Sequence, residues 1–559
     1  MPPHLHAAIP GEADPANEKL ALDWLFENAS NRPDAIAHEI YATLQEPPLM
    51  LTYGELNRKS NALAHWLVSK GIEVEDKVPL CSNRSQYFYI AMAAILKAGG
   101  CYVSIDPELP LERKTFIADD SGAKLVFTAA EDAPTFGDRA VLLSESLLAD
   151  ALTSFGGEDV CHATLDSLAY LLYTSGTTGN PKGCLLEHRG LYWAMLSFCA
   201  LPKPVTNPDT DKRLALASTA FDVHISEIVQ SWCLGSRLVS APRFELLTQL
   251  RKHVVDIGIT HMGMVPSMIE ALLQKPDGLP LKYLVSGGEK ITDSLLEKWS
   301  NREGLVLANF YGPTEATIGC TSRRVGLYDR KENIGRAFPS CSAFVVDRNL
   351  DIVPIGCPGE LIARHSSIHG ALPLTLQGYH GLPEATAKAF IDFPNPGDRA
   401  YRTGDLVRMM ADGSIEIMGR IDLQVKYRGV RIETEGVSSI LVSASEASSI
   451  VASTFITTHP AVANELLVSV VAPRESTVSI ETRRTTVPDL LHTDDAKALI
   501  RTLKKAVDAK LPVYQRPAYI LPVAFMPLSF NGKTDNKVLA HLVRNLDMGT
   551  LLEVQGGKA

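Results

Sequence analysis

The chain has 559 residues, of which 45% are hydrophobic and 21% charged, and its formal net charge is −10. This length predicts two or more hydrophobic cores, and the negative charge without a dense basic stripe argues against nucleic acid as a main partner. No apolar signal core opens the sequence, and no stretch reaches the ~18 uncharged apolar residues of a membrane helix. Nine cysteines without C-x-x-C or metal-ligand spacing predict reduced thiols in a cytoplasmic protein that does not bind a membrane.

The first 400 residues alternate apolar runs of strand length with helix-period segments, which predicts an α/β architecture with several sheets. Residues 51–57 open a helix that continues to Val68 and stops at Lys70-Gly71. Residues 96–107 predict the end of a helix, a glycine stop, a strand and a proline turn. Both segments are expected to serve the fold and not the chemistry.

The segment from Tyr173 to Gly183 follows an apolar run at 168–172 and places hydroxyl residues and glycines before Lys182. Backbone N–H groups, hydroxyls and an ammonium in one loop can surround a polyphosphate. The segment is not the P-loop of common NTPases, because Gly183 stands where that motif needs Ser or Thr. Composition alone favours an ordinary surface loop, so this interpretation depends on other motifs.

Three such motifs follow. Residues 309–317 predict a turn in which an asparagine and two aromatic residues can hold an adenine by amide hydrogen bonds and stacking. Residues 401–420 predict a hairpin with Asp412-Gly413 at its turn, and Asp405 is suited to accept both hydroxyls of a ribose. The sequence then becomes charged and predicts a small α+β domain with a lysine loop at 531–535. Each motif alone also fits an ordinary turn.

Together the motifs resemble those of adenylate-forming enzymes: acyl-CoA synthetases, luciferases and the adenylation domains of non-ribosomal peptide synthetases. The resemblance runs from about Trp24 to Leu539. It implies a multi-subdomain α/β fold with an N-terminal adenylation core at 1–421, which holds the ATP and amino-acid pocket. A mobile α+β lid at 422–559 would turn about Asp422.

The resemblance implies ATP and Mg²⁺ as cofactors. Thr314 would reach the α-phosphate, Glu315 would bind Mg²⁺ through a carboxylate oxygen, and Lys533 would bridge the substrate carboxylate and ATP. Catalysis would rest on positioning and charge neutralisation, so His188 and His224 are interpreted as structural. The other ATP contacts carried over from the family are Thr174, Ser175, Gly176, Thr177, Thr178, Gly179, Lys182, Asn309, Tyr311, Asp405 and Arg420.

Amino-acid members of the family hold the substrate's α-ammonium with an aspartate that follows an aromatic residue, as Asp222 follows Phe221 here. Ser226 lies one helical turn further on. Many of the carried-over pocket residues are small, and apart from Asp222 and Lys533, for the α-ammonium and the carboxylate, none is charged, which predicts a wide pocket for a large neutral side chain. Small residues can instead permit tight backbone packing. The remaining pocket positions are Val223, Gly263, Leu284, Ser286, Phe310, Ile318 and Gly319.

This pocket resembles those of fungal hydroxamate-siderophore synthetases, which activate N5-acyl-N5-hydroxyornithines. The resemblance is strongest to the third adenylation domain of one such synthetase. The resemblance implies transfer of the aminoacyl group to the phosphopantetheine thiol of a carrier domain, with neighbouring synthetase domains as partners. No condensation or carrier motif occurs, so an excised domain or a stand-alone activator is expected. One departure is residues 362–367, which replace the family's glycine-rich stretch and lead into a longer loop.

Three alternatives stay open. An acyl- or aryl-CoA ligase shares the first half-reaction, although Asp222 argues against it. Another large amino acid could be the substrate. A catalytically inactive domain that senses a nucleotide or an amino acid is a third reading, against which the presence of Lys533, Glu315 and Asp405 argues.

Overall fold

The computed structural model describes residues 8–9, 18–176, 179–200, 207–365, 376–396, 398–422, 424–446, 449–529 and 532–555. These residues form two compact units. The first unit lies within Met1–Pro107, Lys114–Thr174 and Gly183–Ile421. The second lies within Glu108–Arg113, Ser175–Lys182 and Asp422–Ala559. Two short segments that the motif analysis assigned to the N-terminal core therefore cluster with the second unit.

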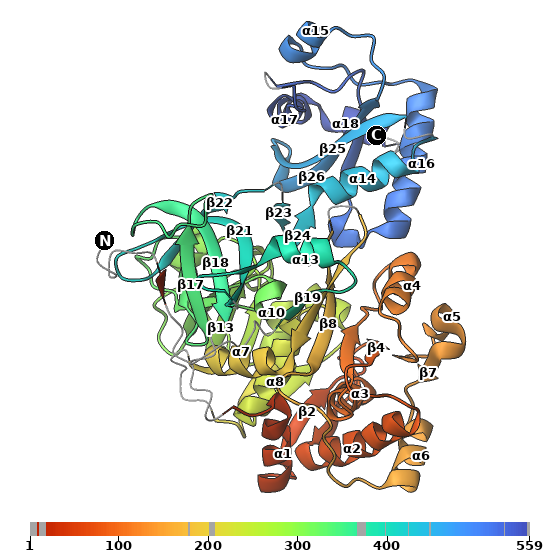
Figure 1. Ribbon diagram of the computed structural model, residues 1–559, viewed down its shortest axis with the longest axis vertical. Coiled ribbons are helices and arrows are strands. Elements are labelled where there is room, and N and C mark those ends of the chain that lie inside the picture. The colour runs from red at the N-terminus through yellow and green to blue at the C-terminus, as the bar shows by residue number, and fades with distance from the viewer. Residues whose placement is uncertain are drawn as a thin grey trace. The chain divides into compact units, whose positions relative to one another are not determined.

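The larger sheet of the first unit contains 15 strands among the described residues, in the order β1-β17-β18-β21-β22-β16-β15-β14-β13-β12-β10-β11-β2-β3, with β20 beside β21. The neighbouring strands from β2 through β11, β10, β12 and β13 to β14 pair in parallel. From β14 through β15 and β16 to β22 the neighbours pair antiparallel. Figure 1 shows β17, β18, β21 and β22 running side by side. The strands are β1 (Ala8–Ile9), β2 (Ile36–Ile40), β3 (Leu49–Thr52), β10 (Lys212–Leu214), β11 (Arg237–Ser240), β12 (His261–Met264), β13 (Tyr283–Gly287), β14 (Val306–Tyr311), β15 (Thr321–Arg324), β16 (Asn333–Ala337), β17 (Cys341–Val346), β18 (Pro358–His365), β20 (Phe390–Asp392), β21 (Arg399–Met409) and β22 (Ile415–Arg420).

A second sheet has the order β19-β9-β8-β5-β4-β6-β7. Its strands β8, β5, β4, β6 and β7 pair in parallel, and β19 runs antiparallel to β9. Strand β8 is almost wholly buried, as its apolar sequence requires of a strand covered on both faces. The strands are β4 (Lys77–Cys81), β5 (Cys101–Ser104), β6 (Val126–Thr128), β7 (Ala140–Leu142), β8 (Leu168–Thr174), β9 (Lys182–Glu187) and β19 (Leu376–Tyr379).

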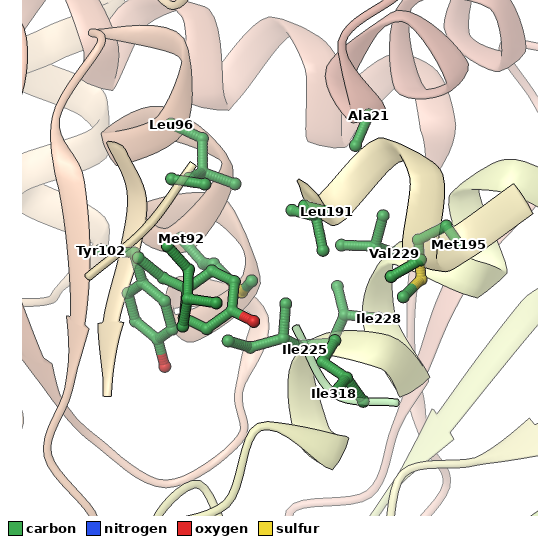
Figure 2. Packing of buried hydrophobic residues seen from close by; sticks show 14 of the residues in the cluster. Ala21, Met92, Leu96, Tyr102, Leu191, Met195, Ile225, Ile228, Val229 and Ile318 are labelled. Atoms are coloured by element: carbon green, nitrogen blue, oxygen red, sulfur yellow. The ribbon is translucent and has the colours of Figure 1, made fainter. Parts of the chain in front are cut away.

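Helices of the first unit pack around these sheets. The main core joins α1, α2, α3, α7 and α8 to both sheets, and a second core surrounds α9, α10 and α12. Figure 2 shows side chains of α7 and α8 meeting in the main core. The helices are α1 (Ala21–Asn31), α2 (Tyr53–Ser69), α3 (Gln86–Lys97), α4 (Leu111–Asp120), α5 (Ala133–Phe136), α6 (Glu145–Phe155), α7 (His188–Ala200), α8 (Val223–Leu234), α9 (Arg243–Thr248), α10 (Leu250–Ile257), α11 (Pro266–Met268), α12 (Asp293–Trp299) and α13 (Pro383–Ala389).

The second unit is a small α+β domain. Its three-stranded sheet has the order β25-β26-β27, and Figure 1 shows α14 lying along it. A separate hairpin of β23 and β24 precedes α14. The elements are β23 (Gln424–Tyr427), β24 (Val430–Glu433), α14 (Thr434–Ala444), β25 (Ile450–His459), β26 (Val462–Pro473), α15 (Ile480–Thr485), α16 (Asp494–Lys510), β27 (Tyr519–Pro522), α17 (Asn536–Asn545) and α18 (Met548–Val554).

Several predicted elements form as expected. The first predicted helix is α2, where Thr52 and Glu55 form a capping box and the helix ends at Lys70. The predicted hairpin is β21–β22, with Gly413 at a φ of 82° in its turn. One expectation was wrong: residues 309–311 do not form a turn but the last three residues of β14. All three side chains are buried, and the aromatic Phe310 and Tyr311 favour a strand.

Candidate active site

The Tyr173–Gly183 segment begins at the end of β8. Thr174 is the last residue of this strand, and Gly176 and Gly179 follow in the loop. Thr177 and Thr178 lie outside the described residues. The Ser175 hydroxyl donates a 2.9 Å hydrogen bond to the backbone oxygen of Arg431, so within the second unit this loop is anchored to β24.

The same loop packs closely on the start of α14. A Cβ atom on Gly179, whose φ is +91°, would overlap Ile440, and one on Gly436 would overlap the backbone oxygen of Gly176. Glycine is therefore needed at these positions for close approach. Lys182 lies close enough to Glu433 for its charge to act on that carboxyl. Burial raises the pKa of Glu433, and the positive charges of Arg431 and Lys182 oppose that rise.

Asp222 stands at the start of α8 and is 7% exposed. Burial raises its pKa from 3.8 to about 6, although a hydrogen bond with Thr314 acts in the opposite direction. Its Oδ2 atom has no hydrogen-bond partner in the part of the chain that the structure describes. A buried carboxylate oxygen without a donor is costly, and it marks a place where a bound cation would be stabilised.

Tyr170, on β8, was missed by the motif analysis. The side chain is 1% exposed, and its hydroxyl has no hydrogen-bond partner among the described residues. Burial raises the pKa of this phenol, and the charge of Asp222 adds to the rise. A second polar atom without a partner therefore lies within electrostatic range of Asp222. Only its place in an apolar strand was visible in the sequence, which suggested a core residue.

Glu227 fixes the first turns of α8. Its Oε1 accepts hydrogen bonds from the backbone N–H groups of Leu216 and Ala217 at 3.0 and 2.9 Å. Its Oε2 lies 3.2 Å from Arg84 in an ion pair of which both side chains are 9% exposed. These bonds tie α8 to the segment that follows β10, so Asp222 is held at the start of a firmly anchored helix.

The other predicted pocket residues of α8 and β12 differ in their surroundings. Ser226 is buried and its hydroxyl donates a 2.7 Å hydrogen bond to the backbone oxygen of Val223. Val223 itself is exposed. At Gly263, a Cβ atom would meet only Val285, at an ordinary 3.5 Å. A side chain at Gly263 is thus sterically possible, and its absence leaves room.

The predicted pocket residues of β13, β14 and the following loop fall into two cores. Leu284 is fully buried in the second core, whereas Phe310 and Ile318 belong to the main core. Ser286, on the same strand as Leu284, is fully buried, and its hydroxyl has no partner among the described residues. A Cβ on Gly319 would press against the rings of Phe198 and Phe338 at 3.1–3.2 Å. Gly319 therefore serves packing, and the space beside it is filled by aromatic rings.

Asp405 is held in a buried polar cluster. It accepts hydrogen bonds from the Tyr311 hydroxyl and from Arg420, whose Nη1 lies 2.9 Å from Oδ1. Arg420 also donates to the backbone oxygen of Thr403 at 3.1 Å. Burial, reinforced by the charge of Asp405, raises the pKa of Tyr311, so this phenol stays protonated as a donor. The Oδ1 atom of the neighbouring Asn309 is buried without a partner among the described residues.

Glu315 lies in a short 3-10 turn at Thr314–Ala316 and is 2% exposed. Its Oε1 accepts a 2.8 Å hydrogen bond from the hydroxyl of Tyr379, a contact that the motif analysis did not foresee. The two β-branched residues that follow, Thr317 and Ile318, have φ values of 50° and 73°. Such backbone conformations are strained for β-branched residues and concentrate at functional sites.

Lys533 and Asp422 are both exposed within the second unit. The backbone oxygen of Lys533 accepts a 2.7 Å hydrogen bond from Ser529, which closes a tight loop, whereas Asn531 lies outside the described residues. Asp422 accepts from the backbone N–H of Gln424 at 3.1 Å. These bonds fix the two backbones and leave open what the Lys533 ammonium binds.

The two histidines interpreted as structural are deeply buried. His224 contacts the Tyr102 hydroxyl at 3.0 Å and the backbone oxygen of Phe221 at 2.6 Å. Burial lowers the pKa of His224 to about 3 and that of His188 to about 4. Both are neutral at physiological pH. Within the described ranges no cluster of three or more His, Cys, Asp or Glu side chains could hold a metal, and no helix could cross a membrane.

A family model decides the class of this chain. The model described as AMP-binding enzyme matches residues 25–371, which is more than half of the sequence. The chain belongs to the AMP-binding enzyme family. It is an adenylate-forming ligase of the type found as adenylation domains in non-ribosomal peptide synthetases, and the family implies that it uses ATP.

Several curated relatives are fungal synthetases. The chain is 44% identical over 549 residues to coprinoferrin synthetase of Coprinopsis cinerea, which covers 95% of this chain and 22% of that protein. It is 35% identical to the nonribosomal peptide synthetase sidC of Aspergillus fumigatus, with 95% and 11% covered. For sidN of Epichloe festucae the identity is 34%, with 89% and 10% covered. The chain therefore spans about a fifth or less of the length of these relatives.

Solved structures confirm the adenylate-forming fold. The o-succinylbenzoate CoA synthetase MenE of Bacillus subtilis has a TM-score of 0.72 at 17% identity, covering 94% of this chain and 98% of that one. NpsA-ThdA, an artificially fused adenylation–PCP di-domain from Klebsiella oxytoca, has a TM-score of 0.71 at 21% identity, covering 90% and 86%. The large N-terminal and small C-terminal parts predicted from the motifs belong to this fold.

Proposed function

We propose that the protein activates an α-amino acid as its aminoacyl adenylate and passes it to the thiol of a carrier domain. The substrate carboxylate attacks the α-phosphorus of ATP, which forms an acyl–phosphate anhydride and releases pyrophosphate. The carrier's phosphopantetheine thiol then attacks the acyl carbon, and AMP leaves. The observation that carries the amino-acid assignment is the buried Asp222, whose Oδ2 lacks a donor among the described residues.

An α-ammonium supplies the missing donors. Its positive charge would lower the pKa of Asp222, which is raised to about 6 with burial as the largest cause, and a charged hydrogen bond in a buried site is stronger than a neutral one. The Tyr170 hydroxyl, also without a partner among the described residues, would accept a second ammonium hydrogen. Acyl- and aryl-CoA ligases act on acids without this ammonium, so they have no use for a buried carboxylate here.

The nucleotide would be held by the residues around β14 and β21. The Asn309 amide oxygen, buried without a partner among the described residues, would accept from the adenine amino group, beside the Tyr311 ring. Asp405, oriented by Arg420, would accept the ribose hydroxyls. Mg²⁺, when bound, would neutralise phosphate charge, and Glu315, a hard carboxylate oriented by Tyr379, would hold it.

The remaining roles fall to the loop and to Thr314 and Lys533. The loop hydroxyls and N–H groups from Thr174 to Lys182 would contact the phosphates, and Thr314 the α-phosphate. Lys533 would neutralise the carboxylate and ATP as they react. We place the hinge at Asp422, the residue at which the second unit's main segment begins, with a core at 1–421 and a lid at 422–559.

The side chain activated is proposed to be a long neutral one, an N5-acyl-N5-hydroxyornithine destined for a siderophore. Gly263 leaves room beside Val285, and apart from Asp222 and Lys533, which would bind the α-ammonium and the carboxylate, no carried-over pocket residue is charged. The buried Ser286 hydroxyl lacks a partner among the described residues and suits a polar amide or hydroxamate. The similarity to coprinoferrin synthetase supports this assignment, whereas Gly319, packed by two aromatic rings, does not add to the width.

A matched substrate pair tests the amino-acid assignment. Pyrophosphate exchange into ATP would be measured with an N5-acyl-N5-hydroxyornithine and with the same acid lacking its α-amine. We expect exchange only with the amino acid, and we expect Asp222→Ala to lower kcat/KM at least 100-fold while ATP binding persists. Equal exchange with both acids, or an unchanged Asp222→Ala variant, would contradict the role of Asp222 and favour the CoA-ligase alternative.

A further inference from the structure

The C-terminal ends of α7 and α8 bring two thiols together outside the proposed active site. The Sγ atoms of Cys199 and Cys233 lie 3.6 Å apart, a direct sulfur–sulfur contact. Both side chains are partly exposed, so a small reagent in solution can reach them. The two cysteines are 34 positions apart in the sequence, which makes this a long-range pairing and not a consequence of sequence neighbourhood.

Helix packing holds the two sulfurs in place. On α7, Leu191 and Met195 precede Cys199 at intervals of four residues, and on α8, Ile225 and Val229 precede Cys233 at the same spacing. Residues four apart share one face of a helix. Figure 2 shows side chains of both rows in one cluster, and all four are buried in the main core. Each cysteine therefore continues a row that is already packed against its partner.

A cation lies beside the pair. The Arg213 guanidinium, on the neighbouring strand β10, interacts electrostatically with both thiols and is fixed by a 2.6 Å hydrogen bond to Gln230 on α8. A positive charge favours the thiolate, which is the reactive form of cysteine. The carbonyl ends of α7 and α8 act in the opposite sense, and the Arg213 guanidinium supplies a positive charge close to both sulfurs.

We propose that Cys199 and Cys233 form a dithiol site that a low-molecular-weight disulfide, such as glutathione disulfide, oxidises to an intramolecular disulfide. One thiolate attacks a sulfur of the small disulfide, which forms a mixed disulfide and releases one small thiolate. The second cysteine, after losing its proton, attacks the protein sulfur of that mixed disulfide and releases the second small thiolate. The protein dithiol loses two electrons and two protons, and the small disulfide gains them as two thiols.

Closure needs little movement. The sulfurs must approach from 3.6 Å to the roughly 2.0 Å of a disulfide bond. The link would tie α7 to the C-terminal end of α8, the helix whose other end carries Asp222. It would also close a loop of more than 30 residues, so the oxidised protein should be more heat-stable.

The test is a peptide map of the full chain after incubation with glutathione disulfide, alkylation of the remaining thiols and digestion without reduction. We expect one cross-linked species that joins the Cys199 and Cys233 peptides, and a melting temperature a few degrees higher that dithiothreitol reverses. Cys199→Ser and Cys233→Ser should each lose the cross-link and the shift. Cys161→Ser, at an exposed thiol, should retain both.

The wild-type map decides the matter even if a serine variant folds poorly, which circular dichroism would reveal. Mixed disulfides on either cysteine without a cross-link would overturn the proposal. So would a melting temperature that rises equally in the Cys199→Ser variant.

Discussion

Replacing Asp222 by asparagine should separate stability from function. Burial raises the pKa of Asp222 from its ordinary 3.8 to about 6, and a tenfold change in proton binding corresponds to about 1.4 kcal/mol. The ionised carboxylate therefore costs the folded protein about 3 kcal/mol above pH 7. Asparagine keeps the shape and removes the charge, although its amide leaves a buried polar group unpaired at a cost of about 1–2 kcal/mol.

The sign of the pH dependence follows from linkage. Because the pKa is higher in the folded state, the folded protein binds more protons between pH 4 and 6, and its stability falls as the pH rises through that window. Of the ~3 kcal/mol, about half is lost between pH 5 and pH 8. Asp222→Asn lacks this loss, so its melting temperature should gain on the wild type by roughly 2 °C between pH 5 and pH 8.

Differential scanning fluorimetry of both proteins at pH 5 and pH 8, without ligands, measures this gain. Asp256→Asn, at an exposed carboxylate of the same unit, is the matched control for replacing a carboxylate by an amide. The variant should also lose amino-acid-dependent pyrophosphate exchange. A melting difference that is the same at both pH values would refute the argument that Asp222 is a desolvated carboxylate.

Three further outcomes are expected. Burial lowers the pKa of Lys97, whose ammonium donates to Asn57 Oδ1 at 2.5 Å and Asn61 Oδ1 at 2.6 Å, to about 7. The stability of the wild type relative to Lys97→Met should therefore rise from pH 7 to pH 10. A difference in melting temperature that does not change with pH would contradict this. Tyr379→Phe removes the donor to Glu315 and should raise the Mg²⁺ concentration for half-maximal exchange several-fold, whereas Tyr328→Phe, at a 94% exposed ring, should not. Gly263→Met should lower kcat/KM for the acylated hydroxyornithine at least tenfold and leave the melting temperature unchanged. The reason is that a Cβ atom at this position has room beside Val285, whereas the added side chain would fill the pocket. Unaltered kinetics would show that Gly263 does not line the substrate pocket.

Local structure was predictable where sequence signals act over a few residues. The cap at Thr52 and the glycine in the Asp412-Gly413 turn are short-range effects, and both elements form as expected. The fold class was also predictable, because the motifs occur together in one family. The placement of residues 309–311 on a strand was not, since their burial against β13 and β15 depends on pairing with distant segments.

The same limit applies to the candidate site. Tyr379 meets Glu315 across 64 residues, and Tyr170 meets the charge of Asp222 across 52, so neither contact is written in local sequence. The packing of Phe198 and Phe338 around Gly319 likewise depends on three separate elements. Small residues in a motif can indicate either space or close packing, and only the surrounding side chains decide between them.

Pyrophosphate exchange across a substrate panel tests the central claim most directly. The panel would contain the proteinogenic amino acids, ornithine, N5-hydroxyornithine, its short and branched N5-acyl derivatives, and aryl and fatty acids. We expect exchange confined to the acylated hydroxyornithines. Exchange only with acids that lack an α-amine would contradict the role of Asp222, and with it the assignment of this protein to amino-acid activation.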